Sequence, residues 1–213
     1  MTHFTFVLLR EGSSDDGLVR VIRTLLLATG LTEVSGSPRP YGGTVREKLQ
    51  LVHEEEGTID AIFVHRDADC DSPTSRIKEI TDAHESCTLS CDISVIPVIP
   101  IQELEAWLLA DTQQIRNVAG KSAGRKDLRI PKPSKIEKLS NPKETLEAAL
   151  QVASETSGRR LEKIKKSFGT HRRILLERLD VTGPVAELDS WKDLERRIQE
   201  LAESRLADSH GER

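Results

Sequence analysis

The sequence has few aromatic side chains and few cysteines. Phe, Trp and Tyr account for 3% of its 213 residues, so a platform of stacked aromatic rings for single-stranded nucleic acid is not expected. The three cysteines, Cys70, Cys87 and Cys91, are odd in number and lack CxxC spacing. Disulfide frameworks and zinc ribbons need paired cysteines, so the sequence predicts neither and favours a reducing, cytoplasmic location.

Long apolar runs and a phosphate-binding loop are also missing. No apolar run approaches the roughly 20 residues that a membrane helix needs, so we expect no membrane-spanning segment. The apolar run at 4–9 has no basic segment before it, which argues against a signal peptide. Gly120-Lys121-Ser122 matches only the last three positions of the GxxxxGK[ST] loop, so any ATPase activity must come from another protein.

Charge is divided unevenly along the chain. The formal net charge is -4, from 31 Lys and Arg against 35 Asp and Glu. The segment 116–178 carries 17 basic and 7 acidic residues, a net +10, and the remainder carries 14 basic and 28 acidic residues, a net -14. Acidic clusters attract metal cations and basic surfaces attract phosphates, although solvated helix faces of both signs would give the same composition.

Short apolar runs alternate with helical patterns in the N-terminal half. Residues 4–9, 59–64 and 93–99 are apolar runs that predict buried strands. The Gly- and Pro-rich segment 31–43 predicts a loop with a short strand at 31–34. Helices are expected at 15–29, 44–56, 75–85 and 102–111 and, beyond Asp111, where no strand is evident, at 141–157, 161–166, 171–179 and 191–205.

This alternation predicts an α/β protein. We expect a mostly parallel sheet of about four strands with helices on both faces, followed by a helical C-terminal segment. Thr44 and Glu47 have the spacing of a capping box, which predicts the start of the second helix. We expect residues 1–115 to form the core, 116–140 a basic loop, and 141–213 a helical segment that packs on the core.

Acidic residues follow each of the three clearest strands. Glu11 and Asp15 follow the first, Asp67 and Asp69 the second, and Glu103 and Glu105 the third. Ligands of open parallel sheets bind beyond the carboxyl ends of the strands, and neighbouring carboxylates repel unless a cation neutralises them. Hard oxygen ligands without His or Cys favour Mg²⁺ or Mn²⁺.

Each acidic element also has a structural interpretation. Glu11 and Asp15 are typical of a helix start, where the helix dipole favours negative charge. The sequence Asp67-Ala68-Asp69 is also typical of a turn after a strand. Residues two apart on a helix point in different directions, so only one of Glu103 and Glu105 can face a metal, and the sequence leaves open which.

Two motifs together resemble a known fold. Glu-Gly-x-x-Asp after the first strand, with Asp-x-Asp after a later strand, resembles the Toprim (topoisomerase–primase) fold, and the spacing of Glu11 and Asp15 is similar to nucleases of the overcoming-lysogenization-defect group. The stretch 102–111 (QELEAWLLAD), followed by Asn141-Pro142-Lys143, resembles bacterial Toprim-like proteins of domain-of-unknown-function family 4276. The resemblance covers roughly residues 4–146.

The resemblance implies a Toprim-like core with a divalent-metal site that hydrolyses phosphodiester bonds of DNA or RNA. It implies catalytic roles for Glu11, Asp67 and Lys143, with Lys132, Lys135 and Lys138 as neighbouring alternatives to the lysine. Glu103 stands where related nucleases often carry a hydroxyl residue, so its role is open. The implied metal ligands are Glu11, Asp15, Asp67, Asp69 and Glu105.

The same resemblance implies partners. We expect nucleic acid as substrate, a separately encoded ATPase, and a role in phage defence; homo-oligomerisation is left open. The basic residues expected to contact nucleic acid are Lys121, Arg125, Lys126, Lys132, Arg172 and Arg173.

Two rival functions remain open. An apolar strand followed by Asp-Ala-Asp also resembles the metal-binding turn of nucleotide-sugar glycosyltransferases, but that interpretation leaves Glu11 and Asp15 without a role. A non-catalytic Toprim interaction module is the other alternative, although such modules often lose acidic residues that this sequence retains.

Overall fold

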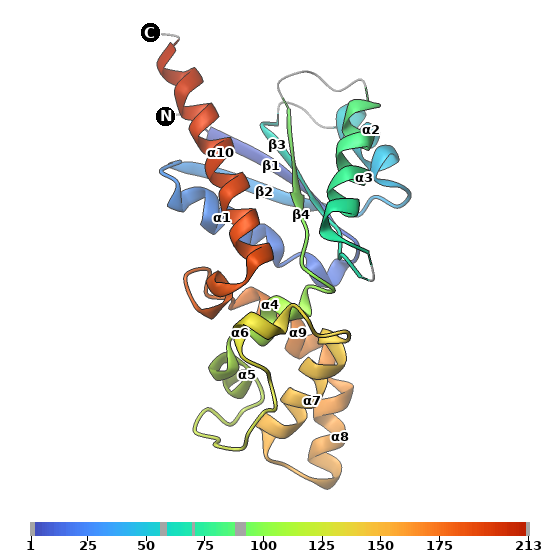
Figure 1. Cartoon of the computed structure of the whole chain (residues 1–213), viewed down its shortest axis with the longest axis vertical. Coiled ribbons are helices and arrows are strands. Elements are labelled where there is room, and N and C mark those ends of the chain that lie inside the picture. The colour runs from blue at the N-terminus through green and yellow to red at the C-terminus, as the bar shows by residue number, and fades with distance from the viewer. Residues whose placement is uncertain (1–2, 56–58, 70, 88–92, 212–213) are drawn as a thin grey trace. The chain divides into compact units, whose positions relative to one another are not determined.

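The computed structural model describes residues 3–55, 59–69, 71–87 and 93–211 (Figure 1). Cys70 and Cys91 lie outside the described residues. The chain divides into two compact units. The first comprises Met1–Arg66, Asp71–Ile99 and Asp193–Arg213, and the second comprises Asp67–Cys70 and Pro100–Lys192.

The first unit is built on a four-stranded, all-parallel sheet. Its strands are β1 (His3–Leu9), β2 (Glu33–Arg39), β3 (Ala61–His65) and β4 (Ser94–Val98), in the order β2-β1-β3-β4. The α/β class and the three apolar strands are therefore confirmed. Every residue of β3 is buried, which explains why its sequence is a continuous apolar run rather than an alternating one.

Helices cover both faces of this sheet. Figure 1 shows α1 (Leu18–Ala28) and α10 (Asp189–Gly211) on one face, and α2 (Val45–Glu55) and α3 (Pro73–Glu85) on the other. In α1, every third or fourth residue is apolar and buried, so one stripe of this helix packs inward. Helices on both faces were predicted, and the strand order places β1 and β3 at the centre.

The second strand is longer than its sequence predicts. The segment 31–43 predicts mainly loop, but β2 continues through Gly36 and Pro38. Gly36 pairs with Phe6 of β1, and a Cβ at Gly36 would lie 2.1 Å from Cζ of that ring. Pro38 is tolerated because β2 is an edge strand, where one side of the backbone needs no partner.

The capping box at the start of α2 is confirmed. The backbone N–H of Thr44 donates to Oε2 of Glu47 at 2.7 Å, and the backbone N–H of Glu47 donates to Oγ1 of Thr44 at 3.3 Å. The bond from the Thr44 backbone lowers the pKa of Glu47 most, and a bond from Oγ1 of Thr44 to Oε2 of Glu47 at 2.9 Å lowers it further. The two side chains therefore occupy backbone donors that a helix start leaves without an intrahelical partner.

The second unit is helical. It contains α4 (Glu105–Leu109), α5 (Thr112–Val118), α6 (Pro133–Ile136), α7 (Pro142–Ser154), α8 (Gly158–Lys166), α9 (Phe168–Glu177), the 3₁₀ turn η2 (Pro184–Glu187) and the first residues of α10. Its described residues include no strand, as predicted. Trp107 and Trp191 pack edge to face with ring centroids 5.0 Å apart, and Nε1 of Trp107 donates to Oγ of Ser190 at 2.8 Å.

The boundaries of the two units differ from the boundaries expected from the sequence, which were at residues 115 and 140. Both α5 and α6 fall partly or wholly within the expected basic loop 116–140, where Leu128 and Ile136 are buried. The part of α10 from Asp193 on belongs with the sheet rather than with the C-terminal helices. None of the described helices has the length and apolar character that crossing a membrane requires.

Candidate functional site

In the first unit, the acidic residue after β1 forms an ion pair with the basic residue after β3. Oε1 of Glu11 lies 2.8 Å from Nε of Arg66, and Nη1 of Arg66 lies 3.0 Å from Oε1 of Glu79. Strands β1 and β3 are hydrogen-bonded neighbours, so their ends bring these residues together. Glu11 is therefore at the carboxyl edge of the sheet as predicted, and an arginine already opposes its charge.

Asp15 is buried in the short turn η1 (Ser13–Asp15). Its Oδ2 accepts from the backbone N–H of Gly12 at 3.1 Å and lies 3.5 Å from Nδ1 of His65. Oδ1 accepts from Oγ of Ser14 at 3.2 Å. The carboxylate thus closes the turn before α1, which is the structural role that the sequence left as an alternative to metal binding.

Lys48 joins this edge and was missed by the sequence analysis. Its Nζ donates to the backbone carbonyl of Arg10 at 3.1 Å. Burial lowers the pKa of Lys48, as does the charge of Arg66, whereas Glu11 raises it. On α2, Lys48 is adjacent to the buried stripe of Val45, Leu49 and Val52. This position next to apolar residues is the sequence feature that could have predicted its partial burial.

In the second unit, Asp67 supports the turn that leads into α4. Its Oδ1 accepts from the backbone N–H of Leu104 at 2.9 Å. The backbone N–H of Ala68 donates to Pro100 O at 3.1 Å, and that of Asp69 donates to Gln102 O at 2.8 Å. Asp69 has φ of 51° and an exposed side chain. Both predicted aspartates therefore lie on a turn held against the segment 100–104.

Glu103, which follows the third predicted strand, also lies in the second unit near the turn that contains Asp67. Its Oε2 accepts from the backbone N–H of Lys143 at 3.0 Å. Burial raises the pKa of Glu103, the Lys143 hydrogen bond opposes this, and the charges of Glu105 and Asp67 raise it further. Asp67, Glu103 and Lys143 are thus neighbours within the second unit, and the charge of Asp67 acts on Glu103.

Glu105 and Arg172 occupy a different environment from the one expected. Oε1 of Glu105 lies 2.7 Å from Nε of Arg172, and their side chains are 5% and 9% exposed. Arg172 was expected to contact nucleic acid, but it is buried because it neutralises a buried carboxylate. Glu103, which is only partly buried, is the more accessible member of the pair that the sequence left undecided.

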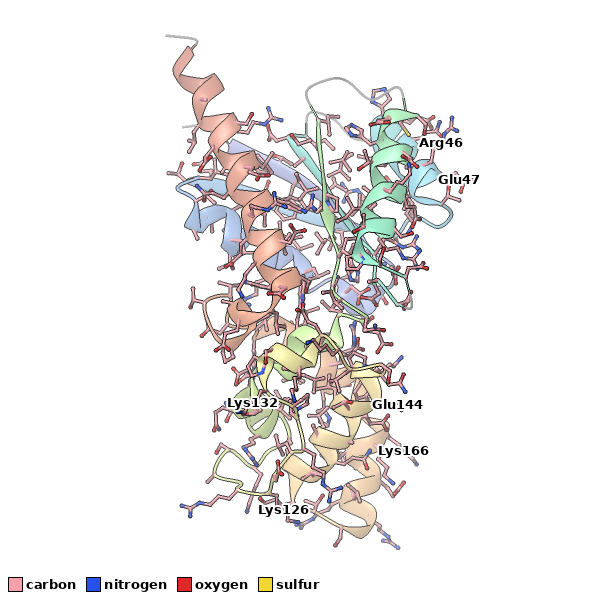
Figure 2. The ribbon with its side chains drawn as sticks, viewed as in Figure 1. Arg46, Glu47, Lys126, Lys132, Glu144 and Lys166 are labelled. Atoms are coloured by element: carbon pink, nitrogen blue, oxygen red, sulfur yellow. The ribbon has the colours of Figure 1, made fainter. Side chains whose placement is uncertain are left out.

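The remaining predicted nucleic-acid contacts lie on the surface of the second unit. Lys121, Arg125, Lys126 and Lys132 are exposed, as is Arg173, whose Nη1 lies 3.4 Å from Oε1 of Glu177. Figure 2 labels Lys126, Lys132 and Lys166, which belong to this unit. Helix α8 adds further exposed cations: Arg159, Arg160, Lys163, Lys165 and Lys166.

No set of three or more His, Cys, Asp or Glu side chains among the described residues is arranged to hold a metal ion. Such a set would be needed for a metal ion whose ligands all come from protein side chains. Mg²⁺ in phosphoryl-transfer sites, however, is usually held by one or two carboxylates, with waters and substrate phosphates as its other ligands. The oxygen donors of Asp67 and Glu103 fit this smaller requirement.

The comparisons with known proteins give one match. The model of a family described as Domain of unknown function (DUF4276) matches residues 11–191, a range that contains Glu11, Asp67, Glu103 and Lys143. Neither the curated proteins nor the solved structures that were searched include a match to this chain.

Proposed function

The chain belongs to the family described as Domain of unknown function (DUF4276), and from that premise we propose that it is a divalent-metal-dependent nuclease of Toprim-like fold. It would hydrolyse phosphodiester bonds of DNA or RNA. The observation that carries the proposal is the meeting of Asp67, Glu103 and Lys143 within the second unit.

The chemistry of this group supports the proposal. The pKa of Glu103 is raised by burial and by two neighbouring carboxylates, so a cation beside Asp67 and Glu103 would relieve a repulsion that the fold maintains. The bonds from Leu104 and Lys143 hold one oxygen of each carboxylate. Carboxylate oxygens of this kind are the ligands that Mg²⁺ and Mn²⁺ prefer.

The proposed roles follow from the positions of these side chains. When bound, a divalent ion supplies charge stabilisation at a phosphoryl oxygen and lowers the pKa of a water molecule. Asp67 and Glu103 would hold this ion, and the exposed Asp69 would be a further ligand. The Lys143 ammonium would orient the scissile phosphate and offset the negative charge that develops on it.

The residues of the first unit enter the proposal differently. Glu11 is paired with Arg66, and Asp15 lies against His65. For either carboxylate to act on a substrate or a metal, its present contact must open, so we assign the central roles to the second unit. The separate ATPase and the phage-defence role remain part of the proposal.

A non-catalytic Toprim interaction module is the second candidate. The ion pairs of Glu11 and Glu105 favour it, because they neutralise two of the carboxylates that a nuclease would use. Under this alternative, Asp67 and Glu103 only support the turn before α4.

Cleavage assays separate the two candidates. Purified protein would be incubated with plasmid, single-stranded DNA and RNA in Mg²⁺, in Mn²⁺ and in EDTA, with and without an ATPase encoded beside it. We expect cleavage in the presence of metal, loss of cleavage in Asp67→Asn, and retention in Asp82→Asn, a matched change at a surface carboxylate paired with Lys78. Absence of cleavage under all conditions, or equal cleavage by Asp67→Asn, would refute the nuclease proposal.

A further inference from the structure

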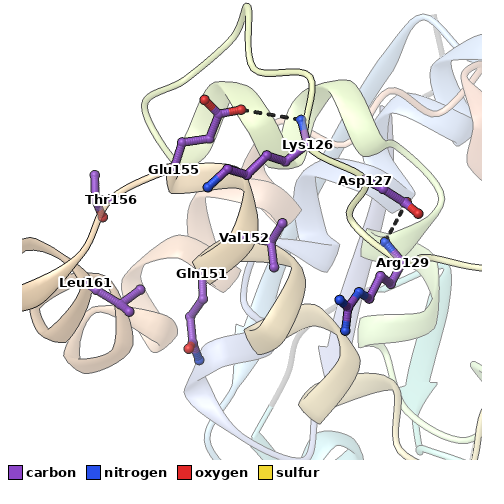
Figure 3. Close-up of a pocket in the computed structure, with 8 residues that line it drawn as sticks. All are labelled: Lys126, Asp127, Arg129, Gln151, Val152, Glu155, Thr156 and Leu161. Atoms are coloured by element: carbon purple, nitrogen blue, oxygen red, sulfur yellow. Dashed lines mark hydrogen bonds between the residues drawn. The ribbon is translucent and has the colours of Figure 1, made fainter.

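A hollow of about 620 Å³ opens in the second unit, apart from the residues of the proposed metal centre (Figure 3). Lys126 and Arg129 contribute from the loop after α5, Gln151 and Val152 from α7, and Leu161 from α8. This volume is in the range of small-molecule sites, which extends from about 300 to 1,000 Å³. The lining combines two cations, two carboxylates, an amide and apolar side chains.

The two carboxylates in the hollow are engaged by backbone groups. Oε1 of Glu155 accepts from the backbone N–H groups of Arg125 at 3.1 Å and Lys126 at 3.4 Å. Oδ1 of Asp127 accepts from the backbone N–H of Arg129 at 2.9 Å. The bond from Lys126 is the main reason that the pKa of Glu155 is lowered. Through these hydrogen bonds, Glu155 and Asp127 stabilise the backbone of the loop after α5.

Unlike the two carboxylates, the side chains of Lys126 and Arg129 are not held by hydrogen bonds within the described residues. Across the part of the chain that the structure describes, neither Lys126 nor Arg129 forms a side-chain ion pair or hydrogen bond, and both are exposed. Figure 3 shows both side chains reaching from the loop toward α7, with that of Lys126 ending near Glu155. The Lys126 charge also lowers the pKa of Glu155, so Lys126 would be shared between that carboxylate and an anionic ligand. The charge of Arg129 is available to the ligand.

The lining indicates which anion fits. Lys and Arg are the usual donors to a phosphate, while Val152 and Leu161 offer an apolar surface and Gln151 an amide that donates and accepts hydrogen bonds. A nucleotide has a phosphate, a flat apolar face and hydrogen-bonding edges. A stacked duplex cannot place one nucleotide in a hollow without extruding it. An unpaired nucleotide is therefore favoured.

We propose that this hollow binds one phosphate-bearing nucleotide unit of a single-stranded nucleic acid, with Lys126 and Arg129 as the phosphate contacts. The basic residues of α8, including Arg159, Arg160 and Lys163, extend the positive surface beside Leu161 and attract the adjoining strand. The inference rests on the proposed function, because it takes nucleic acid as the source of the phosphate. It names a substrate-binding subsite formed by other residues than those of the metal centre.

Binding without catalysis tests this proposal. Fluorescence anisotropy would measure the affinity of a short single-stranded oligonucleotide in EDTA, where no metal-dependent cleavage occurs. The Lys126→Gln/Arg129→Gln variant removes both charges and keeps the backbone N–H groups that hold the loop. Lys78→Gln, an exposed lysine of α3 paired with Asp82, is the matched control.

We expect the double variant to weaken binding at least about tenfold. The slope of log affinity against log salt concentration should fall by about 0.7, since the two side chains contact one phosphate and each phosphate neutralised on a single strand contributes about 0.7. Lys78→Gln should leave both quantities unchanged. An unchanged affinity and salt slope in the double variant would overturn the proposal.

Competition identifies the ligand. A nucleoside monophosphate should displace the oligonucleotide at lower concentration than inorganic phosphate does; equal competition would overturn the nucleotide assignment. If wild-type protein cleaves nothing but the double variant loses binding, the proposed nuclease function fails and this subsite stands. If wild-type protein cleaves and the double variant binds normally, only the subsite fails.

Discussion

Glu105 and Arg172 form a buried ion pair within the second unit, with Nε of Arg172 2.7 Å from Oε1 of Glu105. The two residues are 67 positions apart in the sequence and link α4 to α9. Removing one charge leaves the other buried without a partner, which usually costs more than the pair contributes. The pair therefore makes both residues important for folding, whatever the chain binds.

We predict that Arg172→Met and Glu105→Met each lower the free energy of unfolding by about 3–5 kcal/mol. The double variant should recover much of this loss, because no charge is then left buried. Urea denaturation of the four proteins gives the coupling energy. Single variants as stable as wild type would contradict this assignment, and Arg173→Met, at the exposed neighbour, is the control.

Gly36 gives a second prediction, because a methyl group there would meet the Phe6 ring. We expect Gly36→Ala to destabilise the protein by about 1–3 kcal/mol, the usual cost of overpacking. Gly42→Ala is the matched control, since a Cβ at Gly42 would have no heavy atom within 4 Å. Combining Gly36→Ala with Phe6→Leu should reduce the cost of the first substitution in urea denaturation. Equal stabilities of the two alanine variants would show that the ring does not limit this position.

The raised pKa of Glu103 predicts a specific dependence of stability on pH. Because burial favours the neutral carboxyl in the folded protein, the folded state binds more protons than the unfolded state between the ordinary glutamate pKa of about 4.3 and the higher folded value. The stabilisation is complete below the unfolded pKa and is lost as pH rises through the folded pKa. Glu103→Gln should remove this loss and still accept the Lys143 N–H. Urea denaturation from acid to neutral pH would measure it, and parallel pH profiles of wild type and variant would contradict it.

Metal addition gives a fourth prediction. Mg²⁺ or Mn²⁺ that binds only the folded protein stabilises it in proportion to the logarithm of its concentration above the dissociation constant. At neutral pH, we expect either ion to raise the Tm of wild type and to raise that of Asp67→Asn and Glu103→Gln less. Samples treated with EDTA, which removes free divalent ions, give the baseline Tm of each protein. Identical Tm increases in all three proteins would place any metal binding elsewhere.

The fold was largely predictable because its central strands are continuous apolar runs. Residues 4–9, 59–64 and 93–99 predicted β1, β3 and β4, and the spacing of Thr44 and Glu47 predicted the start of α2. The segment 31–43 was different. Gly36 and Pro38 indicate a loop when considered locally, and only the Phe6 ring and the edge position of β2 explain them.

The candidate site was predictable only in part. Sequence motifs identified Asp67 and Lys143, but Lys143 reaches Glu103 through its backbone N–H, a contact that carries no residue signature. The Glu105–Arg172 pair joins residues far apart in the chain, so charge pattern alone placed Arg172 among surface cations. Lys48 similarly reached the end of β1 through packing of α2 rather than through a motif.

The central claim is best tested by the initial rate of phosphodiester cleavage in Lys143→Gln relative to wild type at saturating Mg²⁺. Among the described residues, the exposed Lys143 side chain forms no hydrogen bond or ion pair, and the hydrogen bond to Glu103 comes from the Lys143 backbone. We predict a loss of at least about 100-fold in rate, comparable to removal of one charge-stabilising donor, with an unchanged Tm. Equal rates for wild type and Lys143→Gln would contradict the account.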